Sequence, residues 1–302
     1  MSDTTEPTVE LLEREWATIY ELCSSLEKNE WALPTDCPGW TVKDQISHII
    51  GTELMLSGEQ PPELSSAEDS AGSERDKSNP SQDNIAAKQF PYVKNPIGEA
   101  NELWVEARRR RPPEQLLEEF HQVTTERLTA LRSMSEGEFA KVGWTPAGQA
   151  PYREFMAIRV FDCWVHEQDI RRAANKPGNL TGRVANHSRN RIRQAMPFVI
   201  GKKVQPQEGS IVVFHITNPG ETDNTFAVKM DGGRAAFMDQ SPNQSSVDTS
   251  PETAYLDMDF ETFACLACGR WDPDESMEQG KVSITGDAKL GSRAVRHLNF
   301  MI

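Results

Sequence analysis

Residues 159–169 read RVFDCWVHEQD, and this stretch determines the fold predicted for the first half of the chain. Residues three and four apart share one face of an α-helix, which places four polar side chains on one stripe: Arg159, Asp162, His166 and Asp169. The neighbouring positions are large and apolar: Ile158, Val160, Phe161, Trp164 and Val165. We expect a polar stripe on so hydrophobic a helix to face an interior, where charges persist only when paired or bound to a metal.

Two interpretations of this stripe are open from these residues alone. Asp162 and His166 lie four residues apart, so a carboxylate oxygen and an imidazole nitrogen could reach the same cation. Alternatively, the four side chains could form a buried salt-bridge network without a metal.

A metal would need a further ligand, and His48 is the candidate. Residues 36–44 read DCPGWTVKD, which predicts a tight Pro-Gly turn and a helix with Thr41 as its N-cap and Asp44 three residues later. His48 would lie about two turns into that helix, beside an apolar face. Because a lone histidine there is more often a hydrogen-bonded core residue, His48 does not by itself decide the question.

Together, the two segments resemble a known family. The similarity is to the mycothiol-dependent maleylpyruvate isomerase family, which belongs to the DinB-like group of metal-binding four-helix bundles. It rests on residues 35–44 with the following His48, and on Asp162 with the following HEQDIR at 166–171. The resemblance implies a metal triad of one histidine from the second helix with an acid and a histidine four apart on the last helix. His48, Asp162 and His166 match those positions. The isomerase itself usually has Glu at the acid position, where this chain has the shorter Asp.

The composition of the chain predicts a cytoplasmic enzyme of two domains. Its 302 residues exceed the usual size of a single core, and no stretch is apolar enough to span a membrane. The N-terminus lacks an export signal, and five cysteines without regular spacing suit a reducing compartment. The net charge of −14 argues against nucleic acid as a partner. We expect the basic run at 108–111 to be a solvated helix end.

Residues 1–178 are predicted to form an antiparallel bundle of four helices. The first covers about 8–30, the second follows the Pro-Gly turn, the third covers about 114–134, and the fourth carries the polar stripe. The polar segment at 57–88 is too long for an ordinary connection in a compact domain. It is therefore expected to be an active-site cover or disordered.

Residues 179–302 are predicted to form an α+β domain, because strands gather together with helices placed around them. We expect a helix at 183–200, a helix capped by Asp259 that ends at Gly269, and an amphipathic helix at the C-terminus. The expected strands are 211–216, 226–230, 235–238, 253–258 and 281–285. This half resembles the sterol-carrier-protein-like domain that accompanies the bundle in the same family.

Two features of the second half carry possible chemistry. Cys265 and Cys268 have the spacing of a zinc or redox pair, but we expect them to be small thiols that pack a helix face. Arg270 matches an arginine that, in the isomerase, is thought to face the metal site from the C-terminal domain. The resemblance implies an anion clamp for a carboxylate substrate or the thiol cofactor. The alternative is a helix-end arginine that binds its own last carbonyls.

The resemblance also implies a reaction. The open position of a divalent ion would take the thiol of mycothiol, the small thiol of actinobacteria, and deprotonate it for attack on a small electrophile. The expected enzyme is a mycothiol-dependent S-transferase or cis–trans isomerase. Zinc is the expected ion, with nickel and manganese as alternatives. Asp169 would orient a ligand and act in catalysis, and Arg159 would neutralise an acid at the cofactor site.

A different class of function is also consistent with the residues. The protein could be a metal- or small-molecule-binding carrier or sensor of the DinB-like group that performs no catalysis. Chelator-sensitive, thiol-dependent turnover would distinguish the enzyme from the carrier.

Overall fold

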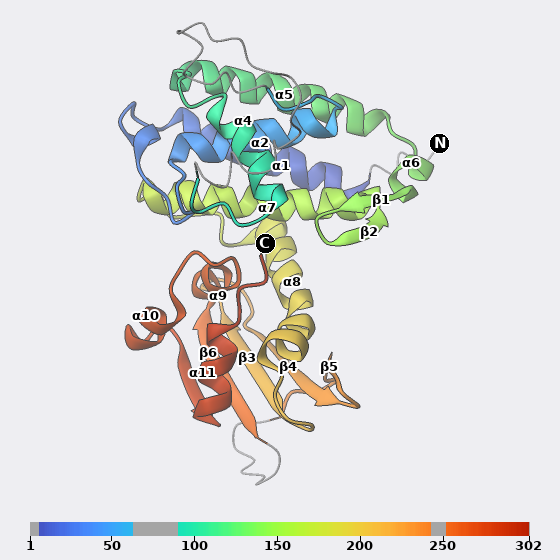
Figure 1. The fold of residues 1–302 in the computed structure, drawn as a ribbon, viewed down its shortest axis with the longest axis vertical. Helices are drawn as coiled ribbons and strands as arrows, with labels where there is room; N and C mark the ends of the chain where they lie inside the picture. The colour runs from blue at the N-terminus through green and yellow to red at the C-terminus, as the bar shows by residue number, and fades with distance from the viewer. Residues whose placement is uncertain (1–5, 63–89, 243–251, 302) are drawn as a thin grey trace, which may run out of the picture. The chain divides into compact units, whose positions relative to one another are not determined.

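The computed structural model describes residues 6–62, 90–242 and 252–301, which divide into two compact units (Figure 1). The first unit extends to Pro177, and the second comprises Gly178–Met301. The first is helical, and the second contains a mixed sheet with helices. The sequence-based prediction of a helical domain followed by an α+β domain is therefore confirmed.

Four long helices build the described part of the first unit: α1 (Pro7–Ser24), α2 (Val42–Leu56), α5 (Pro113–Ser133) and α7 (Tyr152–Ala173). Both α1 and α2 contact both α5 and α7, so each helix of the bundle has two partners. The core between them is filled by large apolar side chains: Leu12, Trp16, Ile19, Ile46, Ile50, Phe120 and Trp164. This arrangement places the inner face of α2 against the inner face of α7.

The start of α2 follows the predicted capping pattern, whereas the end of α1 does not. The backbone N–H of Thr41 donates to the Asp44 carboxylate at 2.8 Å, which completes a capping box. We expected the first helix to continue to about residue 30, but it ends at Ser24. Ser24 and Ser25 donate their hydroxyls to carbonyls of the preceding turn at 2.7 Å. Such local bonds compete with continued helix, which accounts for the earlier end.

Several short elements of the first unit were not predicted. They are a 3₁₀ turn η1 (Glu30–Ala32), helices α4 (Pro96–Glu106) and α6 (Glu136–Ala140), and the hairpin of β1 (Val142–Thr145) and β2 (Gly148–Pro151). The start of α4 has a recognisable signal, because Asn95 accepts from the Gly98 N–H at 2.9 Å and Pro96 occupies the first turn. The polar segment predicted at 57–88 lies mostly at 63–89, outside the described residues.

The basic run that follows α4 is only in part the solvated helix end that we expected, because Arg110 and Arg111 are exposed but Arg108 is not. Arg108 is only 3% exposed, and its guanidinium donates to Glu119 on α5 at 2.7 Å. The carbonyl of Trp104 accepts a further bond from Arg108 at 3.1 Å. A long arginine side chain can cover apolar surface while its head is paired, so Arg108, with Arg111, joins the end of α4 to Glu119 of α5.

The sheet of the second unit has the strand order β5-β4-β3-β6-β7. Its strands are β3 (Ile211–Thr217), β4 (Asn224–Asp231), β5 (Arg234–Phe237), β6 (Thr253–Asp259) and β7 (Ser283–Gly286). The central pair β3 and β6 is parallel, and the other neighbours are antiparallel. All five strands overlap the segments predicted from alternating hydrophobicity.

Helices surround this sheet and bury one set of its alternating side chains. They are α8 (Gly182–Phe198), which continues into the π-helical η3 (Val199–Val204), α9 (Phe260–Ala267), α10 (Pro273–Glu278) and α11 (Ala288–Arg296). Asp259 caps α9 as predicted, accepting from the Thr262 N–H at 2.7 Å. The short α10 was not predicted. Buried side chains along the central strands follow a period of two: Val212, Phe214, Ile216, Ala254, Leu256 and Met258.

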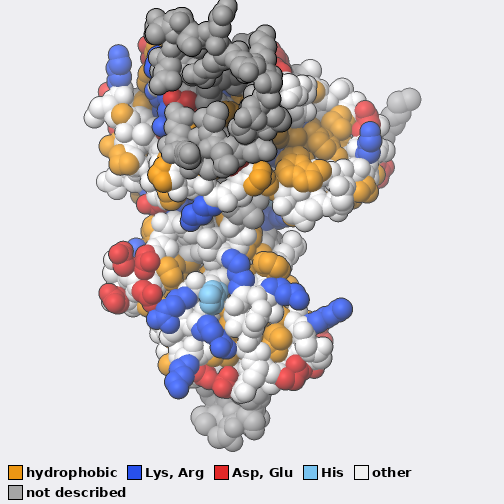
Figure 2. Space-filling view, in the orientation of Figure 1, with side chains coloured by type: hydrophobic (Ala, Val, Ile, Leu, Met, Phe, Trp, Pro, Cys, Tyr) orange, Lys and Arg blue, Asp and Glu red, His pale blue; other side chains and the backbone are white. Residues whose placement is uncertain are grey.

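Charge is distributed unevenly over the second unit. Lys and Arg side chains gather on the face that carries α8 and α11 (Figure 2). No Asp or Glu occurs within α8 or η3, although the chain as a whole has a net charge of −14. Among the described helices, none is long and apolar enough to cross a membrane.

The close approach of α2 and α4 can be tested at Gly51. A Cβ atom there would lie 2.4 Å from the Cβ of Trp104, so Gly51→Ala must displace α4. We expect Gly51→Ala to lower the stability of the full chain by about 1–3 kcal/mol, despite the better helix propensity of alanine. Gly98→Ala in α4 is the control, because its Cβ would meet nothing closer than 3.4 Å. Thermal melting followed by circular dichroism compares the two; equal melting temperatures would contradict the close approach.

Candidate metal centre

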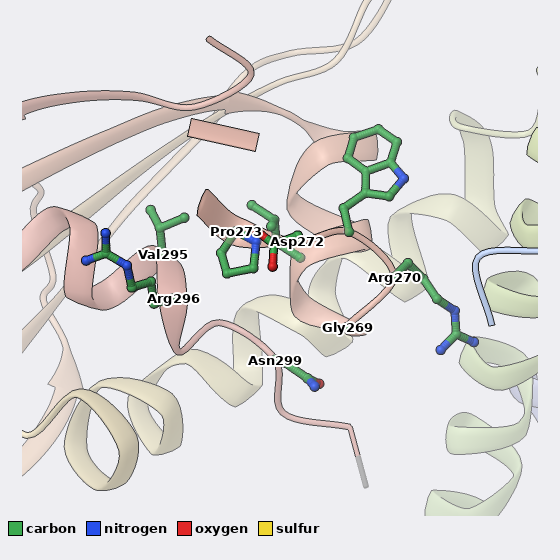
Figure 3. Close-up of a pocket in the computed structure, with 9 residues that line it drawn as sticks. Gly269, Arg270, Asp272, Pro273, Val295, Arg296 and Asn299 are labelled. Carbon is green, nitrogen blue, oxygen red and sulfur yellow. The ribbon is translucent and has the colours of Figure 1, made fainter. Parts of the chain in front are cut away.

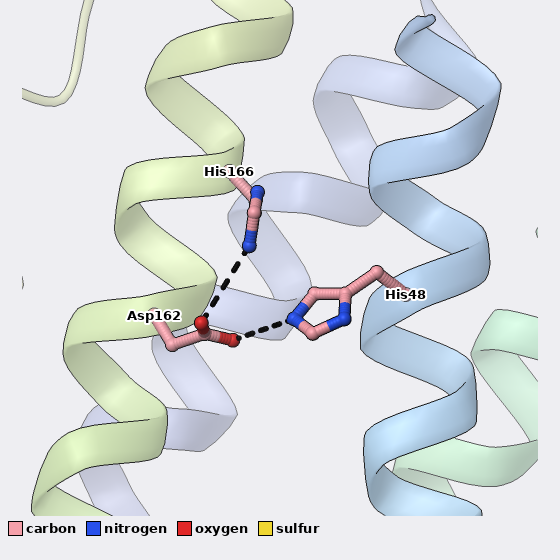
Figure 4. Close-up of side chains that lie close together, drawn as sticks. All are labelled: His48, Asp162 and His166. Carbon is pink, nitrogen blue, oxygen red and sulfur yellow. Dashed lines mark hydrogen bonds and ion pairs between the residues drawn. The ribbon is translucent and has the colours of Figure 1, made fainter. Parts of the chain in front are cut away.

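Three side chains from two facing helices converge inside the first unit (Figure 4). His48 lies on α2, and Asp162 and His166 lie one turn apart on α7. One carboxylate oxygen of Asp162 is 3.2 Å from Nε2 of His48, and the other is 3.5 Å from Nε2 of His166. One potential ligand atom from each residue lies within 4.8 Å of the other two. The structure thus brings together the three residues predicted as metal ligands.

The spacing and chemistry of these donors fit a divalent ion. Metal–ligand bonds of about 2.0–2.2 Å place neighbouring donors about 2.8–3.6 Å apart in octahedral or tetrahedral coordination. Oδ1 of Asp162, the oxygen that Arg159 does not contact, lies 3.5 Å from Nε2 of His166, and one potential ligand atom from each of the three residues lies within 4.8 Å of the other two. Two imidazole nitrogens and one carboxylate oxygen form a donor set that several divalent metals accept.

Gln45 orients His166 in a way that suits a ligand. Nδ1 of His166 donates to the side-chain carbonyl of Gln45, which leaves Nε2 directed at the triad. The Gln45 amide in turn donates to the Thr35 hydroxyl at 2.6 Å. Metal-binding histidines usually have their second nitrogen fixed in this manner. Sequence analysis missed Gln45, although it lies three residues before His48 on the same helix face.

Burial and neighbouring charge shift the pKa values of the triad. Burial lowers the pKa of His48 to about 4, against the opposing attraction of Asp162, so its imidazole is neutral at pH 7. Burial alone would raise the pKa of Asp162, but Arg159 and the two histidines hold it well below its usual range. Burial opposes protonation of His166 as well, but Asp162 and Asp169 raise its pKa. A cation at Nε2 of His166 would therefore compete with a proton for that nitrogen.

A buried ion-pair network lies directly behind the triad. The Arg159 guanidinium contacts Asp162 three residues later and donates to Glu53 on α2 at 2.8 Å. Glu53 is fully buried and also accepts from Arg127 on α5 at 3.1 Å. The two interpretations of the polar stripe are therefore compatible, because Asp162 belongs to both the ligand cluster and the salt-bridge network.

Asp169 is buried beside Nδ1 of His166, the ring nitrogen that does not face Asp162. Its carboxylate is 3.5 Å from Nδ1 of His166 and accepts from Arg172 at 2.6 Å. Arg172 also donates to Asp36, in the turn before α2, at 2.6 Å. The predicted role of Asp169 in orienting His166 stays a prediction, but its position is one from which it could act.

Arg270 lies in the second unit, just after α9. It lines a hollow of about 370 Å³ together with Leu266, Gly269, Trp271, Asp272, Pro273, Val295, Arg296 and Asn299. Its guanidinium points away from Val295 and Arg296 (Figure 3). It donates to the carbonyl of Cys268 at 3.2 Å, the helix-end contact that formed the alternative interpretation. A role for Arg270 as an anion clamp remains a prediction.

The cysteine pair of α9 shows the predicted packing. Cys265 and Cys268 are buried at the end of the helix. Within the described ranges, no third potential ligand joins them at metal-binding distance. Their spacing therefore reflects helix packing in this part of the structure.

Comparisons with known proteins agree with the geometry of both units. Residues 12–171 match the model of the Mycothiol maleylpyruvate isomerase N-terminal domain. The chain belongs to this family. Residues 190–298 match the SCP-2 sterol transfer family, which confirms the sterol-carrier-like character of the second unit.

Solved structures show the same fold over nearly the whole chain. A mycothiol-dependent maleylpyruvate isomerase is 15% identical, with a TM-score of 0.53 and coverage of 93% of this chain and 92% of that one. A variant of a mycothiol-dependent maleylpyruvate isomerase with a histidine replaced by alanine gives 14% identity, the same TM-score and the same coverage. No curated protein matches the sequence. At this level of identity the likeness establishes a shared fold.

The network behind the triad can be tested through Glu53. Glu53→Leu would leave Arg127 and Arg159 buried without their shared counter-charge, so we expect a loss of about 3–5 kcal/mol of stability. Glu53→Gln, which keeps the shape, should lose less and serves if the leucine variant fails to fold. Glu13→Gln is the control, since Glu13 pairs with Arg132 at the surface, where ion pairs contribute about 0–1 kcal/mol. Urea denaturation in the presence of chelator measures the free energy of unfolding of the three variants. Equal losses of stability at positions 53 and 13 would contradict the network.

Proposed function

We propose that this protein is a mycothiol-dependent metalloenzyme that acts on small electrophiles, as an S-transferase or a cis–trans isomerase. The observation that carries the proposal is the convergence of His48, Asp162 and His166 at the spacing of one metal ion. Family membership supports it, because the family model is described by an enzyme that uses this thiol. The solved structure with the same fold is also a mycothiol-dependent enzyme.

The proposed metal is a divalent ion held by three protein donors, with zinc expected and nickel or manganese as alternatives. Such an ion supplies an open coordination position at which a thiol, otherwise mostly protonated with a pKa of roughly 8.5, becomes a thiolate. His48 and His166 would bind through Nε2, and Asp162 through one carboxylate oxygen. Arg159 would neutralise the other oxygen, which it contacts directly.

The residues around the ligands would keep them in place. Gln45 accepts the Nδ1 proton of His166 and so maintains the tautomer that presents Nε2 as a donor. Asp169 would assist from the same side at 3.5 Å. Precise orientation of this kind matters because small displacements of a ligand weaken both binding and catalysis.

Both candidate reactions would begin with formation of the same C–S bond, in which the thiolate sulfur adds to an electrophilic carbon. If a double bond is attacked, rotation and loss of the same thiolate restore it with the other geometry, and no atom is gained or lost. If the sulfur were to stay attached, S-transfer would end either with departure of a leaving group and its electron pair from the attacked carbon, or, after addition to a double bond, with uptake of a proton by the neighbouring carbanion.

A carrier or sensor is the second candidate function. It is favoured by the match of residues 190–298 to a sterol transfer family, which suggests a binding role for the second unit. A carrier would bind a small molecule stoichiometrically and would not consume an electrophile. Turnover that requires a thiol and stops on chelation distinguishes the enzyme.

Removal of one proposed ligand tests whether the triad binds a metal ion. We expect one divalent ion per chain in the parent protein and a severe loss of occupancy in His166→Ala, because two ligands remain. His121→Ala is the control, since His121 packs beside Tyr20 in the same unit. Elemental analysis gives the metal content, and consumption of monobromobimane or maleylpyruvate with mycothiol, with and without chelator, gives the activity. A parent protein that stays metal-free when supplied with zinc, nickel and manganese would overturn the proposal.

Arg270 is the proposed anion-binding residue for a carboxylate substrate or polar groups of the thiol. Its guanidinium suits a carboxylate because two parallel hydrogen bonds can form. We expect Arg270→Ala to keep its metal and its fold but to lose about tenfold or more in kcat/KM, equivalent to about 1.4 kcal/mol. Arg296→Ala is the control, because Arg296 lines the same hollow but is paired with Asp274 at 2.8 Å. Unaltered steady-state kinetics in Arg270→Ala would identify a helix-end arginine instead.

A further inference from the structure

Trp40 contacts both of the histidines in the triad. Its ring centroid lies 5.2 Å from that of His48 and 5.7 Å from that of His166. The two imidazoles themselves meet edge to face at 4.6 Å. Three rings from the turn before α2, from α2 and from α7 therefore form one cluster. An aromatic ring packed against two others at these distances restricts how each can rotate.

The Trp40 indole is held by a buried carboxylate on a third helix. Its Nε1–H donates to Glu102 of α4 at 2.9 Å. Glu102 is 1% exposed, and its second oxygen accepts from the Tyr92 hydroxyl at 2.9 Å and from Arg109 at 2.6 Å. Because an indole has a single donor, this bond fixes the orientation of the ring in its plane. The arginine and the tyrosine stabilise the carboxylate that makes it.

The backbone that carries Trp40 is also constrained. Gly39 has φ of +79°, and a Cβ there would lie 2.3 Å from the Tyr92 ring, so only glycine fits. The Thr35 hydroxyl donates to the Trp40 carbonyl at 2.8 Å. The same hydroxyl accepts from Gln45, which in turn accepts from His166. The turn thus contacts His166 by two routes, through the Trp40 ring and through Gln45.

We propose that Trp40 is a positioning residue that fixes the ring planes of His48 and His166 for metal binding, and that Glu102 acts through Trp40. The proposal rests on the function proposed above, because the two histidines are its metal ligands. It explains why Glu102 is buried and hydrogen-bonded to Tyr92 and Arg109. In the hydrogen bonds and ion pairs described, none of these three residues contacts either histidine. Removal of the indole N–H or of the Glu102 charge should loosen both ligands together.

The experiment measures binding of Co²⁺, a spectroscopic probe for such a site, to the full chain. We expect Trp40→Phe, which keeps a ring but lacks the N–H, and Glu102→Gln each to weaken Co²⁺ binding by about tenfold or more. Both should alter the visible absorption spectrum of the bound ion, which reports ligand geometry. The double variant should bind about as weakly as either single variant, because both changes act on the same Trp40–Glu102 hydrogen bond.

Matched controls separate positioning from a general loss of stability. Glu119→Gln neutralises a carboxylate that binds Arg108 and Arg111, and the hydrogen bonds and ion pairs described for Glu119 do not include Trp40. Trp31→Phe changes a buried tryptophan of η1. Both controls should bind Co²⁺ with the parent affinity and spectrum, and circular dichroism confirms that each variant is folded.

The outcomes separate this inference from the proposed function. Weaker binding, an altered spectrum and non-additive effects in the two test variants support the positioning role. Parent-like affinity and spectrum in folded Trp40→Phe and Glu102→Gln overturn it while leaving the metal centre intact. Additive losses, or equal losses in the controls, also overturn it. A parent protein that binds no Co²⁺ overturns the proposed metal centre and this inference together.

Discussion

The Asp162 carboxylate is the group on which the arrangement of the first unit depends. Largely withdrawn from water, it needs compensating partners on both oxygens. Its own helix supplies Arg159 three residues before and His166 four residues after. The remaining partner, His48, comes from α2. That requirement fixes how far α2 can slide along α7, since a shift of one helical turn would remove His48 from the carboxylate.

Charges of alternating sign extend from this carboxylate through the bundle. Arg127 on α5 pairs with Glu53 on α2, Glu53 pairs with Arg159 on α7, and Arg159 pairs with Asp162. In such a series each interior charge lies between two opposite ones, which limits the cost of burial. His48 and His166 lie at the Asp162 end of this series of charges. A proton on His166, or the cation proposed for the three ligands, would complete the alternation.

Sequence reasoning found the parts of this centre that are close together along the chain. Helical spacing predicted the stripe from Arg159 to Asp169, and the capping pattern at Thr41 placed the helix that carries His48. It missed interactions that join distant segments. Glu102 lies 62 residues from Trp40 along the chain. It belongs to α4, a helix that was not predicted from the hydrophobic periodicity of the sequence. Glu53 reads locally as one polar residue near a helix end, and its burial becomes evident only when α5 and α7 pack against it.

The short arm of Asp162 links metal chemistry to the stability of the bundle. With one methylene group, the carboxylate stays close to its own helix, where Arg159 can reach it. A longer acidic side chain would extend toward α2 and leave Arg159 with Glu53 as its remaining acidic partner. Any change in the charge of the triad therefore alters the electrostatic interaction of Asp162 with Arg159. Through Arg159 it also affects the ion pairs of Glu53 and Arg127. That series connects α2, α5 and α7 through one continuous set of ion pairs, so the charge on the triad bears on how these three helices pack.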